Sequence, residues 1–122
     1  MSLSFWIPGA PVPYTRARRV GNRYFLDAKT IAYRESVRRA CGKRELLTGA
    51  VAVVITAYLV RPKSSKRADP TIKPDIDNIA KQILDALNGI AWKDDAQVVR
   101  LTVQKRYDDS GEGGVDVWIS NY

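Results

Sequence analysis

The apolar run at residues 50–60 limits the folds open to this chain more than any other stretch. It reads Ala-Val-Ala-Val-Val-Ile-Thr-Ala-Tyr-Leu-Val and is rich in β-branched side chains. A run that is apolar at nearly every position predicts a central β-strand covered on both faces. A chain of 122 residues can bury such a strand in one domain without disulfide bonds.

Further helices and strands are expected on either side of this strand. Strands are predicted at 4–7, 97–106 and 115–119, and helices from Asp27 or Thr30 to about Cys41 and over 75–88. Gly21-Asn22 indicates the tight turn of a hairpin within residues 14–25, and the last two strands are expected to form an antiparallel hairpin around 108–114. The order β-β-α-β-α-β-β predicts an α+β fold, a small single domain over residues 1–122 with a mixed sheet and two main helices.

The helix at 75–88 has the clearest sequence pattern. Pro74 precedes it, Asp75 stands at its N-cap position, and Gly89 follows it. One face is expected to be apolar and buried, and it consists of Ile76, Ile79, Ala80, Ile83, Leu84, Ala86 and Leu87. The other face is expected to be polar, and it consists of Asp77, Asn78, Lys81, Gln82, Asp85 and Asn88.

The charge of the chain is divided between its two parts. Residues 1–74 hold fifteen Lys or Arg and four Asp or Glu, and residues 75–122 hold five and nine, so net charges of +11 and −4 sum to +7. A strongly basic segment favours a polyanion such as nucleic acid as the partner. No apolar run reaches eighteen residues, so no bilayer span is expected, and a membrane surface is disfavoured because no strongly basic amphipathic helix with aromatic anchors is evident.

Two basic segments are the candidates for DNA binding. Around the Gly21-Asn22 turn lie Arg16, Arg18, Arg19 and Arg23 among aromatic side chains, a combination typical of loops that hold phosphate. The segment 61–74 has no periodicity and contains Lys63, Lys66, Arg67 and Lys73. A solvated hairpin and a plain linker are the alternatives for these two segments.

The absence of histidine limits the possible chemistry. It excludes Ser-His-Asp triads, histidine bases and histidine-containing zinc sites, so catalysis would depend on carboxylates, Lys, Tyr, Ser or a hard metal ion. The one cysteine, Cys41, has no histidine to activate it and is expected to be a small packing residue. A single cysteine and no visible signal peptide predict a reducing compartment, the cytoplasm.

Acidic residues gather at the start of the helix at 75–88 and again after its end. Asp75 and Asp77 stand at the start with Lys81 one turn on, and Asp94-Asp95 follow the helix. Mg²⁺ prefers carboxylate ligands, and a nearby lysine can stabilise charge that develops on a phosphate. Helix capping and an ordinary i,i+4 ion pair of the lysine are the structural alternatives.

These acidic blocks and their spacing resemble a known nuclease family. Asp75-Ile-Asp-Asn-Ile-x-Lys81 is followed by Asp85-Ala-Leu-Asn-Gly-Ile-Ala-Trp-Lys-Asp-Asp-Ala-Gln-Val-Val99, and the chain opens with Pro8-Gly-Ala-Pro-Val-Pro13, an Arg-rich turn and Thr30-x-x-Tyr33-Arg-Glu. Together they resemble the RusA family of Holliday junction resolvases over nearly the whole chain. Lys73-Pro74 departs from that pattern, because family members often place arginine directly before the first aspartate.

The resemblance implies a small Mg²⁺-dependent homodimer, with Mn²⁺ able to substitute, that cuts four-way DNA junctions by paired hydrolysis in recombination and repair. Such proteins are commonly encoded by prophages. By position, Asp75, Asp77 and Asp95 are implied as catalytic carboxylates that hold the metal ion. Lys81 is implied as the catalytic lysine, and Asp94 stands at a neighbouring acidic position that could also bind metal.

Asp95 poses a problem of distance. A helix of fourteen residues spans about 21 Å, and Asp95 follows the end opposite to Asp75. Five or six extended residues at about 3.3 Å each could only just retrace that length. Either residues 90–94 run back along the helix, which we favour, or Asp95 completes the site of a partner subunit.

The sequence therefore predicts a structure-selective endodeoxyribonuclease that acts on branched DNA. Two coordinated cuts in a junction of near two-fold symmetry would need two active sites related by a two-fold axis. A less selective Mg²⁺-dependent flap or fork nuclease and a non-catalytic DNA-binding module are the alternatives.

Overall fold

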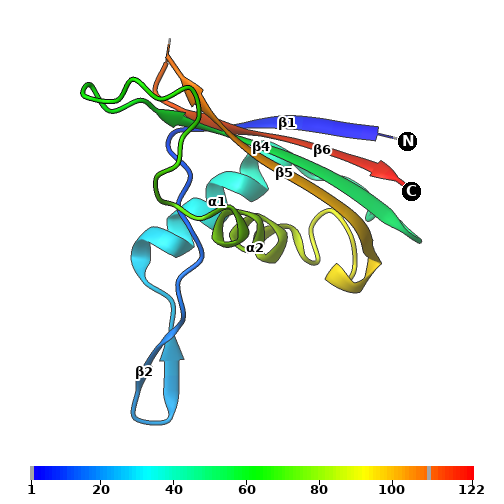
Figure 1. Ribbon diagram of the computed structural model, residues 1–122. Coiled ribbons are helices and arrows are strands. Elements are labelled where there is room, and N and C mark those ends of the chain that lie inside the picture. The colour runs from blue at the N-terminus through cyan, green and yellow to red at the C-terminus, as the bar shows by residue number, and fades with distance from the viewer. Residues whose placement is uncertain (1, 110) are drawn as a thin grey trace.

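Two helices pack on one face of a mixed four-stranded sheet (Figure 1). The computed structural model describes residues 2–109 and 111–122. The sheet has the order β1-β6-β4-β5 and consists of β1 (Ser2–Pro8), β6 (Gly114–Asn121), β4 (Val51–Val60) and β5 (Val98–Asp108). β4 and β5 are parallel, and the other neighbours are antiparallel. With the helices α1 (Ala28–Cys41) and α2 (Ile76–Leu87), this is the predicted α+β fold.

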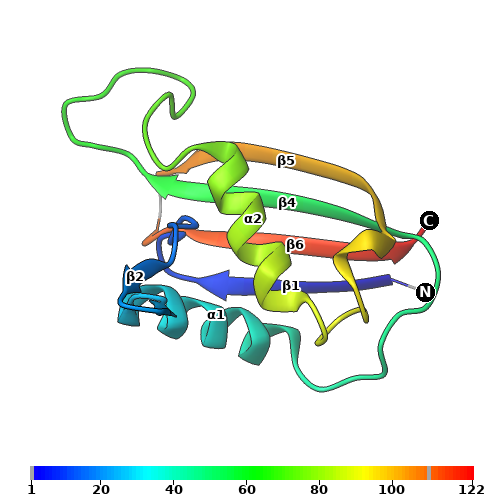
Figure 2. The same ribbon diagram turned by 90° about the horizontal axis from the view of Figure 1, so that it is seen from below.

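The apolar run forms β4, a central strand as predicted, which lies between β6 and β5, but only one of its faces is covered. Residues on the helix side are buried, namely Val51, Val53, Ile55, Ala57 and Leu59, and they alternate with half-exposed ones. Both helices lie on the same side of the sheet (Figures 1 and 2). On the open side Tyr58 packs against Trp6, with 5.8 Å between ring centroids. The prediction of two covered faces is therefore wrong. Apolar residues also occupy the open face of β4, so the sequence pattern looked like that of a strand covered on both sides.

α1 begins and ends where its capping residues predict. The Asp27 carboxylate accepts a hydrogen bond from the backbone N–H of Thr30 at 2.7 Å, which holds the pKa of that carboxyl below its usual range. Gly42 ends the helix with a φ of 77°, a conformation that glycine adopts without strain. Cys41 is 2% exposed, and burial raises the pKa of its thiol, so it is the predicted packing residue.

α2 crosses the sheet beside α1, and its buried face differs most from the predicted one at Ile76 and Gln82, while Leu84 is partly buried. Ile76, expected in the core, is 41% exposed because it lies at the first residue of the helix. Gln82, expected on the polar face, is fully buried, because that side of α2 faces α1. There its Oε1 accepts a hydrogen bond from Arg34 Nε at 2.9 Å.

β5 and β6 run antiparallel as predicted, but they do not form a hairpin. β4 lies between them and pairs with both, so the connection after β5 crosses the end of β4. Gly113 in this connection has a φ of 84°, and a Cβ atom there would lie 2.8 Å from the carbonyl oxygen of Tyr58. The glycine thus permits the chain to cross the end of β4. The sequence prediction missed this crossing because it assumed that strands adjacent in sequence pair with each other.

The irregular segment 61–74 joins β4 to α2 and is held at both ends. Arg61 Nε lies 2.6 Å from Asp109, and the Arg61 guanidinium covers the Tyr107 ring at 4.1 Å. Lys105 Nζ of β5 donates to the backbone carbonyls of Ile72 and Pro74 at 2.6 and 3.0 Å. The start of α2 is therefore fixed to the sheet. In the described part of the chain, no helix is long and apolar enough to cross a membrane.

Candidate active site

The first turn of α2 presents two carboxylates. Asp75 has the extended backbone of an N-cap residue, and its carbonyl accepts a hydrogen bond from Ile79 N at 3.1 Å. Its side chain, however, makes no capping hydrogen bond. Asp77 follows one residue into the helix and is exposed. Within the described residues neither carboxylate has a side-chain partner, so capping does not account for Asp75.

Lys81 lies one turn further along α2, between an acid and an aromatic ring. Its Nζ is 3.9 Å from Asp85 Oδ2 and 4.7 Å from the centroid of the Tyr14 ring. Both contacts attract the positively charged group, one through opposite charge and the other through the negative face of the ring. The i,i+4 ion pair given as the structural alternative for Lys81 is therefore present with Asp85, and the ammonium also packs on a residue from the N-terminal segment.

A hollow of about 420 Å³ opens at the start of α2. It is lined by Pro13, Tyr14, Thr15, Lys73, Pro74, Asp75 and Asn78. The backbone N–H of Tyr14 donates to the carbonyl of Asn78 at 2.9 Å, which fixes the N-terminal segment against α2. Tyr14 and Asn78 were not predicted as site residues. The adjoining Asp-x-Asp-Asn motif and the aromatic residue before the arginines were the only sequence signals for them.

Asp95 lies at the other end of α2. Its Oδ1 accepts a hydrogen bond from Trp92 Nε1 at 2.7 Å, and its backbone N–H donates to Asn88 Oδ1 at 3.0 Å. Gly89 N donates to Trp92 O at 2.7 Å, so the chain after α2 folds into a tight turn there. The 3₁₀ helix η1 (Asp95–Gln97) follows, and Figure 2 shows this yellow segment turned away from the start of α2.

The favoured path, in which residues 90–94 run back along α2, is therefore wrong. The twelve residues of α2 span about 18 Å, and Asp95 is bonded to the residue that follows the helix. The turn is stable because the fully buried Trp92 anchors it in the core. Within one chain, Asp95 is separated from Asp75 and Asp77 by the length of the helix.

Asp94 has a structural role in the same turn. Its Oδ1 accepts a hydrogen bond from Ala96 N at 3.2 Å, and it is the N-cap residue of η1. Gln97 Oε1 in turn accepts from the backbone N–H of Asp94 at 3.0 Å, which completes a capping box. Each of the two acids uses its Oδ1 within this turn, Asp94 to cap η1 and Asp95 to accept from Trp92.

The chemistry of Asp75 and Asp77 fits Mg²⁺, but the three predicted carboxylates do not come together within one chain. Proteins commonly hold Mg²⁺ with one or two carboxylates, water and substrate phosphate, and Asp75 and Asp77 offer carboxylates without partners. Among residues 2–109 and 111–122, no group of three or more Asp, Glu, Cys or His side chains is close enough to hold a metal ion. The predicted set of three carboxylates is thus divided between the two ends of α2.

Comparison with known proteins identifies the family. Residues 8–120 match the family model described as endodeoxyribonuclease RusA. The chain belongs to the RusA endodeoxyribonuclease family. A protein of Bacillus subtilis (strain 168), named uncharacterized protein YqaN, is 35% identical to it over an alignment that covers 96% of this chain and 94% of that protein. Family membership makes the protein a nuclease that acts on DNA.

The two basic segments of this RusA-family chain flank the start of α2. The Arg-rich segment forms a hairpin of β2 (Arg18–Val20) and β3 (Arg23–Phe25) with Gly21 at its turn. Figures 1 and 2 place this hairpin and the 61–74 segment at the same end of the sheet as the start of α2. Arg16, Arg18, Arg19, Arg23, Lys63, Lys66, Arg67 and Lys73 are all exposed there.

Two arginines of these segments are oriented by local contacts. Arg19 Nε donates to the carbonyl of Gly21 at 2.9 Å, and its guanidinium lies 5.9 Å from the Tyr24 ring centroid. One guanidinium nitrogen of Arg67 donates to Thr71 Oγ1 at 2.7 Å. Guanidinium groups held in this way are suited to contact phosphate.

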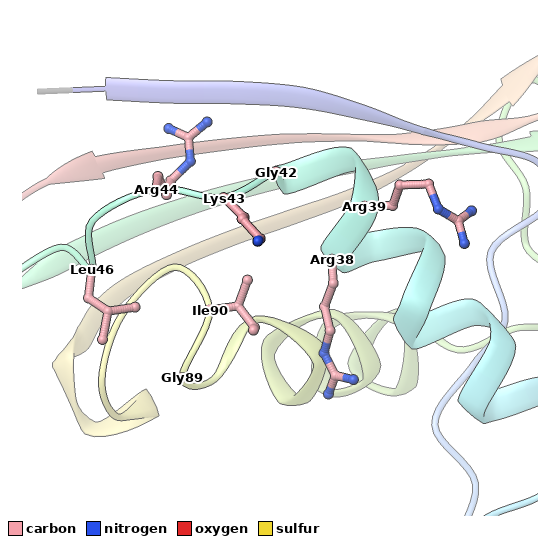
Figure 3. A pocket seen from close by; sticks show the side chains of 8 residues that line it. All are labelled: Arg38, Arg39, Gly42, Lys43, Arg44, Leu46, Gly89 and Ile90. Carbon is pink, nitrogen blue, oxygen red and sulfur yellow. The ribbon is translucent and has the colours of Figure 1, made fainter.

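A second basic hollow of about 480 Å³ lies where α1 ends and α2 ends (Figure 3). It is lined by Arg38, Arg39, Gly42, Lys43, Arg44, Leu46, Gly89 and Ile90. Figure 3 shows Arg38 and Lys43 directed toward the end of α2, whereas Arg39 and Arg44 point elsewhere. No carboxylate lines this hollow.

Proposed function

We propose that the protein is a Mg²⁺-dependent, structure-selective endodeoxyribonuclease that resolves four-way DNA junctions by paired phosphodiester hydrolysis. It would act in the cytoplasm, in DNA recombination and repair. Membership of the RusA family supports the nuclease activity. The partner-free carboxylates of Asp75 and Asp77, with Lys81 one turn on and basic segments on both sides, support this place as the cutting site.

One observation carries the arrangement of the proposed enzyme. Asp75 and Asp77 lie at the start of α2, whereas Asp95 is anchored at its end. A two-fold axis that places the α2 helices of two subunits antiparallel would bring the start of each helix next to the end of the other. Each site would then combine Asp75 and Asp77 with Asp95 of the partner subunit, and one homodimer would hold two equal sites.

Exposed apolar side chains beside α2 support an interface at this place. Ile76 is 41% exposed, and Leu101 of β5 is 42% exposed although its strand neighbour Val53 is buried under the helix layer. Apolar residues left open on an otherwise covered side are typical of surfaces that bind another protein. A second copy of the chain would cover them while it completes both acidic sites.

In the proposed reaction, the three carboxylates hold Mg²⁺, for which Mn²⁺ can substitute. Bound Mg²⁺ supplies Lewis-acid activation of the scissile phosphate and of the attacking water. Lys81 stabilises the negative charge that develops on the phosphate oxygens. Exposed arginines and lysines of the hairpin and of the 61–74 segment bind the DNA backbone on either side of the cut.

A cleavage assay tests the function. Wild type and Asp75→Asn are incubated with a synthetic four-way junction, a flap and a linear duplex, with and without Mg²⁺. We expect paired nicks on the junction, no nicks with Asp75→Asn, and junction binding by both proteins. Lack of cleavage by wild type with either Mg²⁺ or Mn²⁺ would overturn the proposal, and equal cleavage of the flap would favour a less selective nuclease.

A subunit-mixing experiment tests the shared site. Asp75→Asn and Asp95→Asn are each expected to be inactive on their own, and equal amounts of the two are denatured together and refolded. In a shared arrangement, the mixed dimer carries both substitutions in one site and none in the other, so nicking on one strand returns. If each chain built its own site, both sites of the mixed dimer would remain defective and no activity would return.

A further inference from the structure

Two residues outside the carboxylate set make direct contact with Lys81. The Asp85 carboxylate lies 3.9 Å from Lys81 Nζ, and the Tyr14 ring centroid lies 4.7 Å from the same atom. Asp85 comes from the next turn of α2, and Tyr14 comes from the N-terminal segment. The ammonium group is therefore held between two elements that are far apart in sequence.

Asp85 is itself held from the side of α1. A guanidinium nitrogen of Arg34 lies 3.4 Å from Asp85 Oδ2, and Arg34 Nε donates to Gln82 Oε1 at 2.9 Å. Gln82 is fully buried, and its Nε2 has no hydrogen-bond partner among the described residues. A buried amide with an unpaired donor is unfavourable for folding, whereas an apolar residue of similar size would avoid this loss. The one bond that Gln82 makes serves to orient Arg34.

Tyr14 is fixed from its other side. Its backbone N–H donates to the carbonyl of Asn78 at 2.9 Å, and it lines the hollow at the start of α2 together with Asp75. The Tyr14 ring that contacts the Lys81 ammonium therefore lines the same hollow as Asp75. A lysine side chain has four rotatable bonds, so a fixed ring and a fixed carboxylate greatly restrict where its charge can lie.

We propose that Tyr14 and Asp85 are positioning residues for Lys81, and that Gln82 and Arg34 keep Asp85 in place for this task. The inference rests on the proposed function, in which Lys81 stabilises charge on the scissile phosphate. An ordinary surface ion pair would need neither the buried Gln82 nor the aromatic ring. Without either contact the ammonium is free to move, and cleavage slows although Lys81 is still present.

Single-turnover cleavage and binding measurements test the proposal. We expect Tyr14→Leu and Asp85→Asn each to lower the cleavage rate at saturating junction by about tenfold, with little change in the Kd for the junction. Tyr14→Phe keeps the ring face and Asp85→Glu keeps the charge, so both should retain most of the rate. Tyr122→Leu and Asp116→Asn are matched controls, since both residues are exposed and lie away from α2.

A double-mutant cycle separates positioning from simple damage to the fold. In a Lys81→Ala background, where the rate is lower by about a hundredfold, Asp85→Asn and Tyr14→Leu should have no further effect. A merely structural role would slow cleavage equally in both backgrounds. If Lys81→Ala loses its rate while Tyr14→Leu and Asp85→Asn cleave like wild type, the inference is overturned and the proposed function stands. If wild type does not cleave, the proposed function itself fails.

Discussion

The buried indole of Trp92 donates a hydrogen bond to Asp95 at 2.7 Å, which ties one predicted catalytic carboxylate to the hydrophobic core. The backbone of Asp95 is held separately by Asn88, the residue that follows α2. Both contacts fix Asp95 relative to the end of the helix. If Asp95 serves the site of a partner subunit, its position depends on these two side chains.

Trp92→Phe and Asn88→Ala should both lower the cleavage rate, by about ten- to hundredfold, because each frees Asp95 from one contact. Their effects on stability should differ. Trp92→Phe leaves a small cavity and should reduce the free energy of unfolding by about 1–3 kcal/mol. Asn88 is exposed, so Asn88→Ala should change it by less than about 1 kcal/mol. Urea unfolding measures the stability of both variants, and single-turnover cleavage measures their rates. A wild-type cleavage rate for Asn88→Ala would contradict the positioning of Asp95 by Asn88.

Asp94 should tolerate a change that a metal ligand would not. Its side chain caps η1 by accepting from Ala96 N, and asparagine caps about as well as aspartate. We therefore expect Asp94→Asn to cleave at nearly the wild-type rate in Mg²⁺, and Asp94→Ala to lose about 1 kcal/mol of stability. Loss of Mg²⁺-dependent cleavage by a folded Asp94→Asn protein would show instead that this carboxylate binds the metal ion.

Asp27 should make the stability of α1 depend on pH. The Thr30 N–H lowers the pKa of Asp27 in the folded protein, so the folded state favours the charged carboxylate. The stabilisation is fully present above the unfolded pKa of about 3.9 and is lost as the pH falls through the lower folded pKa. Asp27→Ala should thus lower the urea midpoint at neutral pH and have less effect in acid. Asp27→Asn keeps a neutral cap, and its difference from Asp27→Ala should persist in acid.

Gly114 should accept no side chain while Trp6 is present. A Cβ atom at Gly114 would overlap the indole ring of Trp6, which lies across this strand on the open face of the sheet. Gly114→Ala should reduce the free energy of unfolding by about 1–3 kcal/mol. Trp6→Leu in the same chain should recover part of that loss, because the smaller side chain leaves room. Equal destabilisation by Gly114→Ala in both backgrounds would place the cause in the backbone instead.

The sequence predicted the parts of this structure that depend on neighbouring residues. Asp27 and Gly42 bound α1 as expected, and the Asp-x-Asp pair lies at the start of α2. Other features depend on packing between distant elements. The polar residue Gln82 is buried because α1 lies beside it. One face of β4 stays open because both helices pack on the other face of the sheet.

The acidic site shows the same division. Residue types and spacing identified the carboxylates, but the turn that holds Asp95 depends on Trp92 entering the core and on a bond to Asn88. Neither contact follows from periodicity. For the same reason Tyr14, which meets Lys81 only through the folded N-terminal segment, was not predicted as part of the site.

The basic hairpin should determine how junction binding depends on salt. Arg18 and Arg23 lie on its two short strands, at the end of the sheet where α2 begins. Each lost phosphate contact should reduce the slope of log Kd against log salt by about 0.9, so Arg18→Gln with Arg23→Gln should reduce it by about 1.8. The matched control removes the same charge from the open face of the sheet with Arg100→Gln and Arg106→Gln, whose strand neighbours are Ala52 and Tyr58. If both pairs change the slope equally, net charge and not the hairpin governs binding, whereas a change confined to the first pair places DNA on the side of α2.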